Sequence, residues 1–442
     1  MAAATTDERP WLGQWNSTVT SYYVLVGATA LLLVLGLVMV LSSSAVTSIA
    51  EGASPYAAFL DQAKFAIMGL PLLLVGARIP VRWYKRMAWP ALLAALVLLV
   101  AVMFMGVLVN GNRNWLVLGP VRFQPSELAK LALAVWLGAV LGRKQRLLGR
   151  WNHVIMPAVP GFLVVLALVL AGHDLGTALI LIALSLGAFW VAGASGRLLG
   201  LGAGLGAVII GYVFVYGSSD RMGRIFAAYG SCTDPQGECY QSIHGLYALG
   251  SGGVLGLGLG ASREKWRYLP EAHNDFIYAV IGEELGLLGT LMVLGLFIAL
   301  GIAMSRVIRR HPDPFVKVTT AAVACWVVGQ AFINIGVVIG VLPVIGVPLP
   351  LVSAGGSALV TTMAALGMVI SFARSEPGAA EALAARGGVV RRSLAVLGVR
   401  RAAVGGRPGG GRTGGGRPGG GRAGGGRAGG GTSGRRPAGG RR

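Results

Sequence analysis

The sequence predicts an all-α polytopic membrane protein of about ten transmembrane helices. Of its 442 residues, 54% are hydrophobic and only 12% are charged, whereas soluble globular proteins carry about 25% charged residues. A chain this apolar has too little polar surface to cover itself in water. Long apolar runs recur along it, and Lys or Arg follows every second run. These observations together favour a bundle of spanning helices.

Ten apolar runs account for the expected spans. A helix needs about 20 residues to cross a hydrocarbon layer of about 30 Å, because it rises about 1.5 Å per residue. The runs cover residues 22–43, 57–77, 88–109, 127–142, 154–171, 176–193, 199–216, 276–304, 317–340 and 355–373. Lys and Arg cluster after the second, fourth and eighth runs, and Arg197 follows the sixth. The positive-inside rule places these loops, and therefore both chain ends, in the cytoplasm.

Three regions follow along the chain. Residues 1–20 are expected to form a cytoplasmic arm, residues 21–374 the transmembrane domain, and residues 375–442 a disordered tail. Arg recurs every five residues in the tail between Gly-rich spacers, so no apolar face is available for burial. The 15 Arg and two Glu from Arg374 to Arg442 contribute +13 of the net charge of +21. Most of the positive net charge therefore belongs to the tail and does not indicate a nucleic-acid-binding fold. The tail is suited to bind anionic membrane lipids or an acidic protein, or it is simply solvated.

The longest extracytoplasmic loop, residues 217–275, lies between the seventh and eighth spans. Its apolar Gly-rich stretch 243–260 is suited to a re-entrant or interfacial helix. Cys232 and Cys239 lie in this loop with six residues between them. Because disulfides persist outside the cytoplasm, the two cysteines either form a disulfide or remain free thiols. Cys325 lies in an apolar run and is expected to be inert packing.

Two short polar segments on the extracytoplasmic side contain candidate binding residues. Glu127 lies in the first turn of a predicted helix, three residues before Lys130, so the two can form an ion pair on one face. Arg113 and Arg122 have no nearby acid in sequence and are candidates for an anionic ligand. Asp174 lies in a very short turn between two spans, where a carboxylate needs a partner, such as a loop arginine.

Two further segments lie in the long loop. Arg221 and Arg224 are three residues apart and can lie on one helical face, where they can bind a phosphate. Residues 263–276 contain the densest set of polar side chains and lead directly into the eighth run.

Three carboxylates stand at the beginning of the eighth span, namely Asp275, Glu283 and Glu284. Acidic residues in a membrane-spanning segment indicate a functional site more often than a purely structural role. Asp275 is at the outer boundary, where a polar substrate attached to a lipid meets water, and a general base there can accept a hydroxyl proton. The structural alternative is that Asp275 is an N-terminal helix cap.

The motifs RFQPSELAK, GHDLGTA, YLPEAHNDFIYAVIGEELG and PLPLVSAGGS occur in this order. They resemble the SEDS family (shape, elongation, division and sporulation proteins) over residues 20–373. The LPEAHND form is similar to the division members more than to the elongation members, and the basic tail and paired loop cysteines are similar to actinobacterial members.

The resemblance implies a peptidoglycan glycosyltransferase that polymerises lipid II at the outer face of the cytoplasmic membrane during cell division, with Asp275 as general base. It also implies a divalent cation (Mg²⁺ or Mn²⁺), a class B penicillin-binding protein as transpeptidase partner, other divisome proteins, and localisation at the septum. The undecaprenyl pyrophosphate of the donor needs cations on the outer side. The expected substrate-binding residues are Arg113, Arg122, Glu127, Lys130, Asp174, Arg221, Arg224, Arg263, Lys265, Glu271, His273 and Ser353.

Two other functions remain compatible with the sequence. A lipid II flippase would explain ten spans with intramembrane acids, although the polar residues concentrate on one side of the membrane. A non-enzymatic divisome scaffold that recruits partners through its tail is the third possibility, and it can coexist with catalysis.

Overall fold

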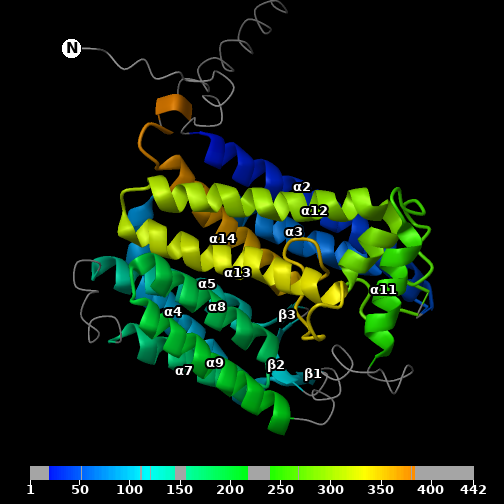
Figure 1. The fold of residues 1–442 in the computed structure, drawn as a ribbon, viewed down its shortest axis with the longest axis horizontal. Coiled ribbons are helices and arrows are strands. Elements are labelled where there is room, and N and C mark those ends of the chain that lie inside the picture. Colours follow the sequence, from blue (N-terminus) through cyan, green and yellow to red (C-terminus); the bar gives the residue numbers. More distant parts are fainter. Residues whose placement is uncertain are drawn as a thin grey trace, which may run out of the picture. The chain divides into compact units, whose positions relative to one another are not determined.

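The computed structural model shows a helical bundle that carries a small β-sheet at one end (Figure 1). It describes residues 19–50, 52–109, 112–119, 121–144, 156–217, 239–266, 268–379 and 381–383. The described residues belong to one compact unit. Most of the predicted N-terminal arm (residues 1–18) and most of the predicted tail (residue 380 and residues 384–442) lie outside the described residues, as do Arg221, Arg224 and Cys232. Cys239 is buried and disulfide-bonded, and Cys325 is a free thiol.

Each of the ten predicted runs coincides with a helix. The helices are α2 (Thr20–Ala50), α3 (Ala57–Gly76), α4 (Val81–Met105), α5 (Pro125–Arg143), α7 (Ala158–Ala171), α8 (Leu175–Ala192), α9 (Gly196–Gly217), α11 (Tyr240–Gly252), α12 (Ile277–Arg310), α13 (Pro314–Val338) and α14 (Gly356–Arg374). In the described part, eight of them are long and apolar enough to cross a membrane, while α7 and the apolar part of α9 are shorter. The polytopic helical class is confirmed, and the number and orientation of the spans stay predictions.

A three-stranded antiparallel sheet was not expected. Strands β1 (Val107–Val109), β2 (Asn112–Leu118) and β3 (Val121–Phe123) form it in this order. The expected span 88–109 was therefore wrong at both ends, since α4 begins at Val81 and ends at Met105. The sequence carried a signal for the turn, because Asn110-Gly111 between β1 and β2 is the dipeptide most typical of a tight hairpin.

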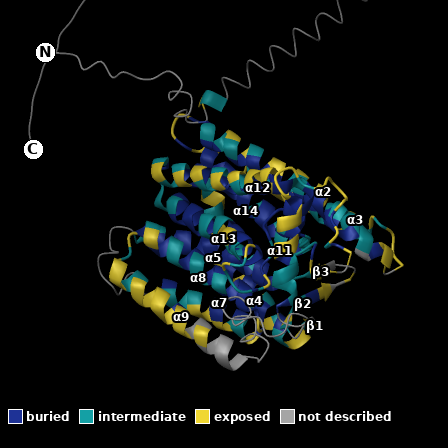
Figure 2. Cartoon of the chain, turned by 45° about the vertical axis from the view of Figure 1, so that its right-hand side comes forward, coloured by how far each residue is buried: buried dark blue, intermediate teal, exposed yellow. Residues whose placement is uncertain are grey.

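Helices α5 and α14 form the centre of the bundle, as their burial shows (Figure 2). About four fifths of each apolar window is buried (83% and 78%), compared with 17% for α3. α5 packs against α4 and α13, and α14 packs against α3. The α5–α13 contact depends on Gly138, because a Cβ there would lie 1.9 Å from Thr319 Oγ1. The exposed apolar faces of α3, α4 and α9 are those expected to meet lipid.

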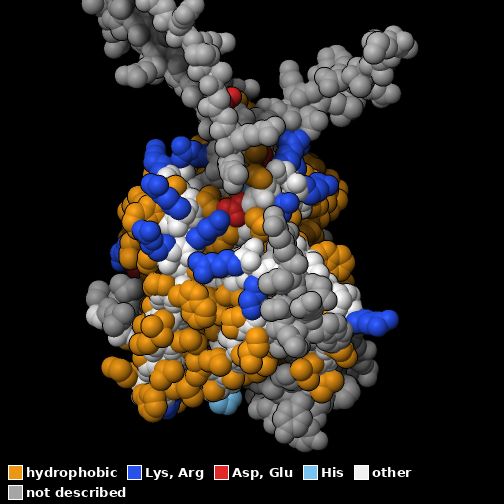
Figure 3. All heavy atoms as spheres, turned by 90° about the vertical axis from the view of Figure 1, so that its left-hand side faces the viewer, with side chains coloured by type: hydrophobic (Ala, Val, Ile, Leu, Met, Phe, Trp, Pro, Cys, Tyr) orange, Lys and Arg blue, Asp and Glu red, His pale blue; other side chains and the backbone are white. Residues whose placement is uncertain are grey.

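The end of the bundle that contains the α12–α13 connection is covered by Lys and Arg (Figure 3). The part of the same face that lies below this basic cap in the view is mostly hydrophobic. One of these cations is paired, since Lys85 on α4 contacts Asp313, the N-cap residue of α13, at 2.5 Å. The sheet and α11 lie at the opposite end of the bundle (Figure 1). This asymmetry is the one that the positive-inside rule associates with a cytoplasmic end.

The orientation can be tested with single introduced cysteines at exposed positions near the two ends. We expect Arg309→Cys, at the end of α12, to react with a membrane-impermeant maleimide only after the cells are opened. Ala261→Cys, before α12, should react in intact cells. The chain without an introduced cysteine is the control. The reverse pattern of labelling would overturn the orientation.

Candidate active site

An open cleft of about 390 Å³ lies among the ends of α5, α8, α11, α12 and α14 and the α13–α14 connection. Its lining is rich in polar side chains, unlike that of a second pocket, which lies among mostly apolar side chains of α7, α8 and α9. Of the predicted site residues, it brings together Glu127, Lys130, Asp174, Glu271 and Asp275. These side chains come from segments as far apart as 148 positions in sequence, so the fold, and not local sequence, assembles the site.

Asp275 is held through its backbone. It lies in the turn before α12, and Asn334 Nδ2 on α13 donates to its carbonyl oxygen at 2.7 Å. The neighbouring carbonyl of Asn274 accepts a hydrogen bond from Ser353 Oγ at 2.7 Å. The carbonyl of His273 accepts one from the backbone N–H of Ala354 at 3.0 Å. The acid is therefore fixed at the cleft wall by two other elements.

The possibility that Asp275 serves as a helix cap is wrong. The N-cap residue of α12 is Phe276, and no side chain there accepts a backbone hydrogen bond. The carboxylate instead lies near Gly346, at which a Cβ would be 3.6 Å from Asp275 Oδ2. Gly346 has a φ of +76° and also lines the cleft.

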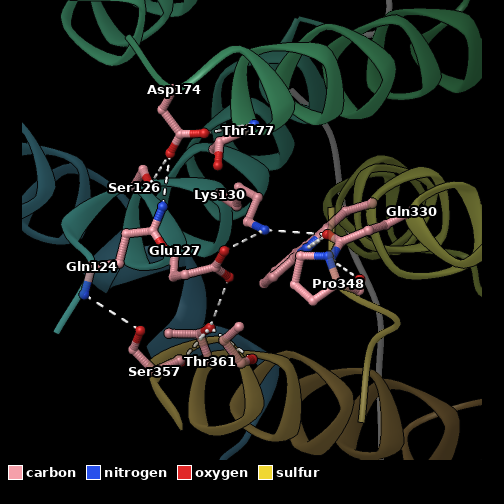
Figure 4. A network of polar contacts seen from close by, with 12 residues as sticks. Gln124, Ser126, Glu127, Lys130, Asp174, Thr177, Gln330, Pro348, Ser357 and Thr361 are labelled. Carbon is pink, nitrogen blue, oxygen red and sulfur yellow. Dashed lines mark hydrogen bonds and ion pairs between the residues drawn. The ribbon is translucent and has the colours of Figure 1, made fainter. Parts of the chain in front are cut away.

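A buried ion pair lies at the base of the cleft (Figure 4). Lys130 Nζ is 2.9 Å from Glu127 Oε1, as the spacing of three residues predicts, and both side chains are buried. Burying two charges is stabilising only when further hydrogen bonds satisfy them. Lys130 Nζ also donates to Gln330 Oε1 at 3.2 Å and lies 5.0 Å from the Trp326 ring centroid. Thr361 Oγ1 donates to Glu127 Oε2 at 3.4 Å.

Asp174 joins the beginnings of two helices (Figure 4). It is the N-cap residue of α8 and accepts from the backbone N–H of Thr177 at 3.0 Å. Its second oxygen accepts from Gln124 Nε2 at 2.7 Å and from Ser126 Oγ at 3.1 Å, both at the beginning of α5. These are the side-chain bonds of Asp174 within the described residues. The expected loop arginine is replaced by neutral donors.

Several predicted substrate-binding residues do not line the cleft. Arg113, Arg122 and Arg263 are exposed, and Arg113 Nη1 donates to the carbonyl of Met103 at 3.2 Å. Among the described cleft residues, Lys130 is the one Lys or Arg. The cations expected to bind the donor pyrophosphate therefore do not include these three arginines among the residues that line the cleft.

Three of the expected substrate-binding residues have contacts within the protein instead. Lys265 is buried, not outward-facing, and it contacts Glu284 at 2.9 Å. Ser353 is also buried, and its hydroxyl supports the backbone before Asp275. His273 is half-buried and contributes its carbonyl to the same support. Glu271 alone of this group lines the cleft, where it accepts from Asn274 Nδ2 at 2.5 Å.

Two amide side chains on α13 that support the site were not predicted from the sequence. Gln330 contacts Lys130, and its Nε2 donates to the carbonyl of Pro348 at 2.8 Å. Asn334 holds both Asp275 and the carbonyl of Val347, the latter at 2.8 Å. The two are four residues apart, so they lie on one helical face. Two amides at this spacing inside an apolar run were a readable signal, because polar groups there need internal partners.

The described residues contain no group of three or more His, Cys, Asp or Glu suited to hold a metal ion. Four carboxylates line the cleft. Glu127 pairs with Lys130, and Asp174 accepts hydrogen bonds from three donors. Glu271, which accepts a hydrogen bond from Asn274 Nδ2, and Asp275 complete the set. This set fits magnesium bound by one or two carboxylates together with substrate phosphates, and does not fit a site built by protein alone.

Comparisons with known proteins agree with this architecture. A protein of Mycobacterium tuberculosis named probable peptidoglycan glycosyltransferase FtsW is 40% identical over 377 residues, which cover 85% of this chain and 71% of the relative. A protein of Halorhodospira halophila with the same name is 38% identical, covering 84% and 94%. Two solved structures are also similar. One, from work described as structural coordination of polymerization and crosslinking by a peptidoglycan synthase complex, has a TM-score of 0.65 at 29% identity, covering 79% of this chain and 96% of the other.

The second is the rod shape determining protein RodA of Thermus thermophilus, with a TM-score of 0.60 at 28% identity, covering 80% and 97%. The profile of the family described as cell cycle protein (FtsW/RodA/SpoVE) matches residues 23–377. The SEDS resemblance is thus confirmed: the chain belongs to the FtsW/RodA/SpoVE family of cell cycle proteins.

Proposed function

We propose that this protein is a peptidoglycan glycosyltransferase that polymerises lipid II at the outer face of the cytoplasmic membrane. The observation that carries the proposal is a carboxylate, Asp275, fixed by its backbone at the wall of a polar cleft in an otherwise apolar bundle. The cleft lies among the helix ends opposite the basic cap. A lipid-linked sugar would enter such a site with its chain in the bilayer and its headgroup in the cleft.

The reaction requires a base at the acceptor sugar. Asp275 would take the proton of the GlcNAc 4-hydroxyl while the hydroxyl oxygen attacks the anomeric carbon of the donor. The bond from that carbon to the pyrophosphate oxygen breaks, and undecaprenyl pyrophosphate leaves with the electron pair. A positioned base of this kind contributes about 10²- to 10⁴-fold to the rate. The fixed main chain around Asp275 suits this role, because a base acts only within hydrogen-bond reach of its proton.

Lys130 is the described cleft residue suited to stabilise the leaving pyrophosphate. Its charge is balanced by Glu127, and its direction is fixed by Gln330. A cation that is held in place before the reaction needs no rearrangement when negative charge develops near it. A divalent cation held by Glu271, Asp275 and the pyrophosphate oxygens would neutralise further charge on the leaving group.

The arrangement favours an enzyme over a flippase. A transporter needs a polar path across the whole bilayer, whereas the described polar cleft is confined to one end and the centre of the bundle is apolar. We propose further that the chain works with a class B penicillin-binding protein and divisome proteins at the septum. The support is that a similar structure comes from a peptidoglycan synthase complex.

Replacing the proposed base should abolish polymerisation. We expect Asp275→Asn to lower the rate of glycan formation from lipid II by about 10²- to 10⁴-fold, because the amide cannot accept the proton. The measurement is polymer length and yield from the purified protein with its transpeptidase partner. Asp61→Asn, an exposed acid on α3, is the matched control and should retain full activity. Robust polymer from Asp275→Asn would exclude the role of essential base.

Removing the buried cation should affect both folding and activity. Lys130→Met leaves Glu127 buried and unpaired, which typically costs about 3–5 kcal/mol. We expect a clear fall in the melting temperature and loss of polymer. Lys64→Met breaks the exposed pair with Asp61 (2.9 Å), and such pairs contribute about 0–1 kcal/mol. Equal effects of the two variants would contradict the role assigned to the Glu127–Lys130 pair.

Removal of divalent cations should stop the reaction reversibly. We expect EDTA to abolish polymerisation and added Mg²⁺ or Mn²⁺ to restore it, because the cleft residues alone leave the pyrophosphate with little compensating charge. Polymerisation assays with and without each ion measure this. Full activity in excess EDTA would remove the cation from the proposal.

A further inference from the structure

Helix α12 is interrupted shortly after Asp275. Gly286 has φ 69° and ψ −164°, which no α-helix contains. In an unbroken helix the backbone N–H groups of Leu287 and Leu288 would donate to the carbonyls of Glu283 and Glu284. The break separates these groups within an apolar bundle, where an unpaired backbone group is costly. Each must therefore find another partner.

The glycine-rich segment 252–260 supplies all four partners. The carbonyl of Glu283 accepts a hydrogen bond from the N–H of Leu257 (2.9 Å), and the carbonyl of Glu284 accepts one from the N–H of Gly258 (3.0 Å). On the other side of the break, the N–H of Leu287 donates to the carbonyl of Gly253 (2.9 Å), and the N–H of Leu288 donates to the carbonyl of Val254 (3.4 Å). The segment thus inserts its backbone into the break. Gly256 and Gly286 make this possible, because a Cβ on Gly256 would lie 2.2 Å from the Glu284 carbonyl oxygen.

A buried ion pair between side chains also connects α12 to the inserted segment near the break. Glu284 is 1% exposed and Lys265 is 3% exposed, and their charged atoms are 2.9 Å apart. Lys265 Nζ also donates to the carbonyl of Gly260 at 2.8 Å. Ser42 Oγ, on α2, donates to Glu284 at 2.6 Å. Glu284 therefore joins α12 to the inserted segment and to a third element.

Glu283 also connects α12 to the residues that follow the inserted segment. Its carboxylate accepts from Ser262 Oγ at 2.5 Å and from the backbone N–H of Arg263 at 2.7 Å. Both acids, which the proposed reaction does not use, thus hold the segment that precedes Asp275 in sequence.

These contacts divide α12 into two parts. The first, residues 277–285, begins two residues after Asp275 and ends at the break. The second, residues 287–310, spans the bundle. The angle between the parts is set by the inserted segment and by the ion pair, since Gly286 is not helical and the backbone groups on its two sides bond to the inserted segment.

We propose that Lys265 and Glu284 are positioning residues for Asp275, which lock the angle of the first part of α12 and thereby the place of the base in the cleft. The inference rests on the proposed function, since it assigns the lock a role in that reaction. An apolar pair could fill the same space, and such replacements are often neutral or stabilising. It could not fix direction through bonds to Ser42 and Gly260. The ion pair thus contributes geometry more than stability.

The test separates geometry from stability with three variants. Lys265→Met and Glu284→Met each leave one buried charge unpaired, and the double variant Lys265→Met/Glu284→Met leaves none. We expect the double variant to recover the melting temperature lost in the single variants, but to retain a kcat at least about tenfold below wild type with KM for lipid II within about twofold. Misplacing a reacting group by about 1 Å can cost about 10²-fold. Asp61→Met/Lys64→Met, at the exposed pair on α3, is the matched control with unchanged kcat.

Hydrogen exchange gives a readout that does not depend on activity. We expect faster exchange in all three variants for peptides that contain the amides of residues 257–258 and 287–288, and unchanged exchange in α13. A double variant with wild-type kcat would overturn the positioning role, and unchanged exchange at these amides would overturn the lock. Should wild-type protein fail to polymerise lipid II, the proposed function fails, while the exchange experiment still decides whether the lock exists. If the single variants do not accumulate, the double variant carries both measurements.

Discussion

The structure depends on one constraint, which is that a polar group buried in an apolar bundle must find its partner inside the chain. The Glu127–Lys130 pair shows how this shapes the site. Its two charges are satisfied only because α13 brings Gln330 and α14 brings Thr361 to the beginning of α5. The requirement for partners therefore fixes three helices relative to one another, and the cleft is the space that these helix ends leave between them.

Much of the bundle was predictable because a bilayer imposes a simple pattern. Apolar runs identify helices, and each predicted run coincides with one. The hydropathy pattern gives the wrong boundary where an apolar segment forms a strand and not a helix. The run 88–109 continues as apolar sequence after the helix ends at Met105, since Val107 and Leu108 are equally suited to a strand. Only the dipeptide Asn-Gly in the sequence indicated a hairpin, and a hydropathy pattern does not reveal such a dipeptide.

The candidate site was predictable where spacing is local and not where it is global. The pairing of Glu127 with Lys130 follows from their three-residue separation, and the structure contains it. The partner of Lys265, Glu284 on α12, lies 19 positions away. The local sequence around Lys265 therefore does not show whether the cation is buried or faces outward. The same limit applies to Asn334, whose contact with the Asp275 backbone spans 59 positions. Such contacts depend on tertiary packing, which periodicity alone does not encode.

The anchored backbone around Asp275 has a consequence for the thermodynamics of substrate capture. Three main-chain carbonyls in succession, those of His273, Asn274 and Asp275, are already bonded to other elements before any sugar arrives. Little conformational entropy is left for this turn to lose when the complex forms. The ordering cost of association then falls on the long flexible polyprenyl chain, so affinity should respond more to changes in the lipid than to changes in the protein loop.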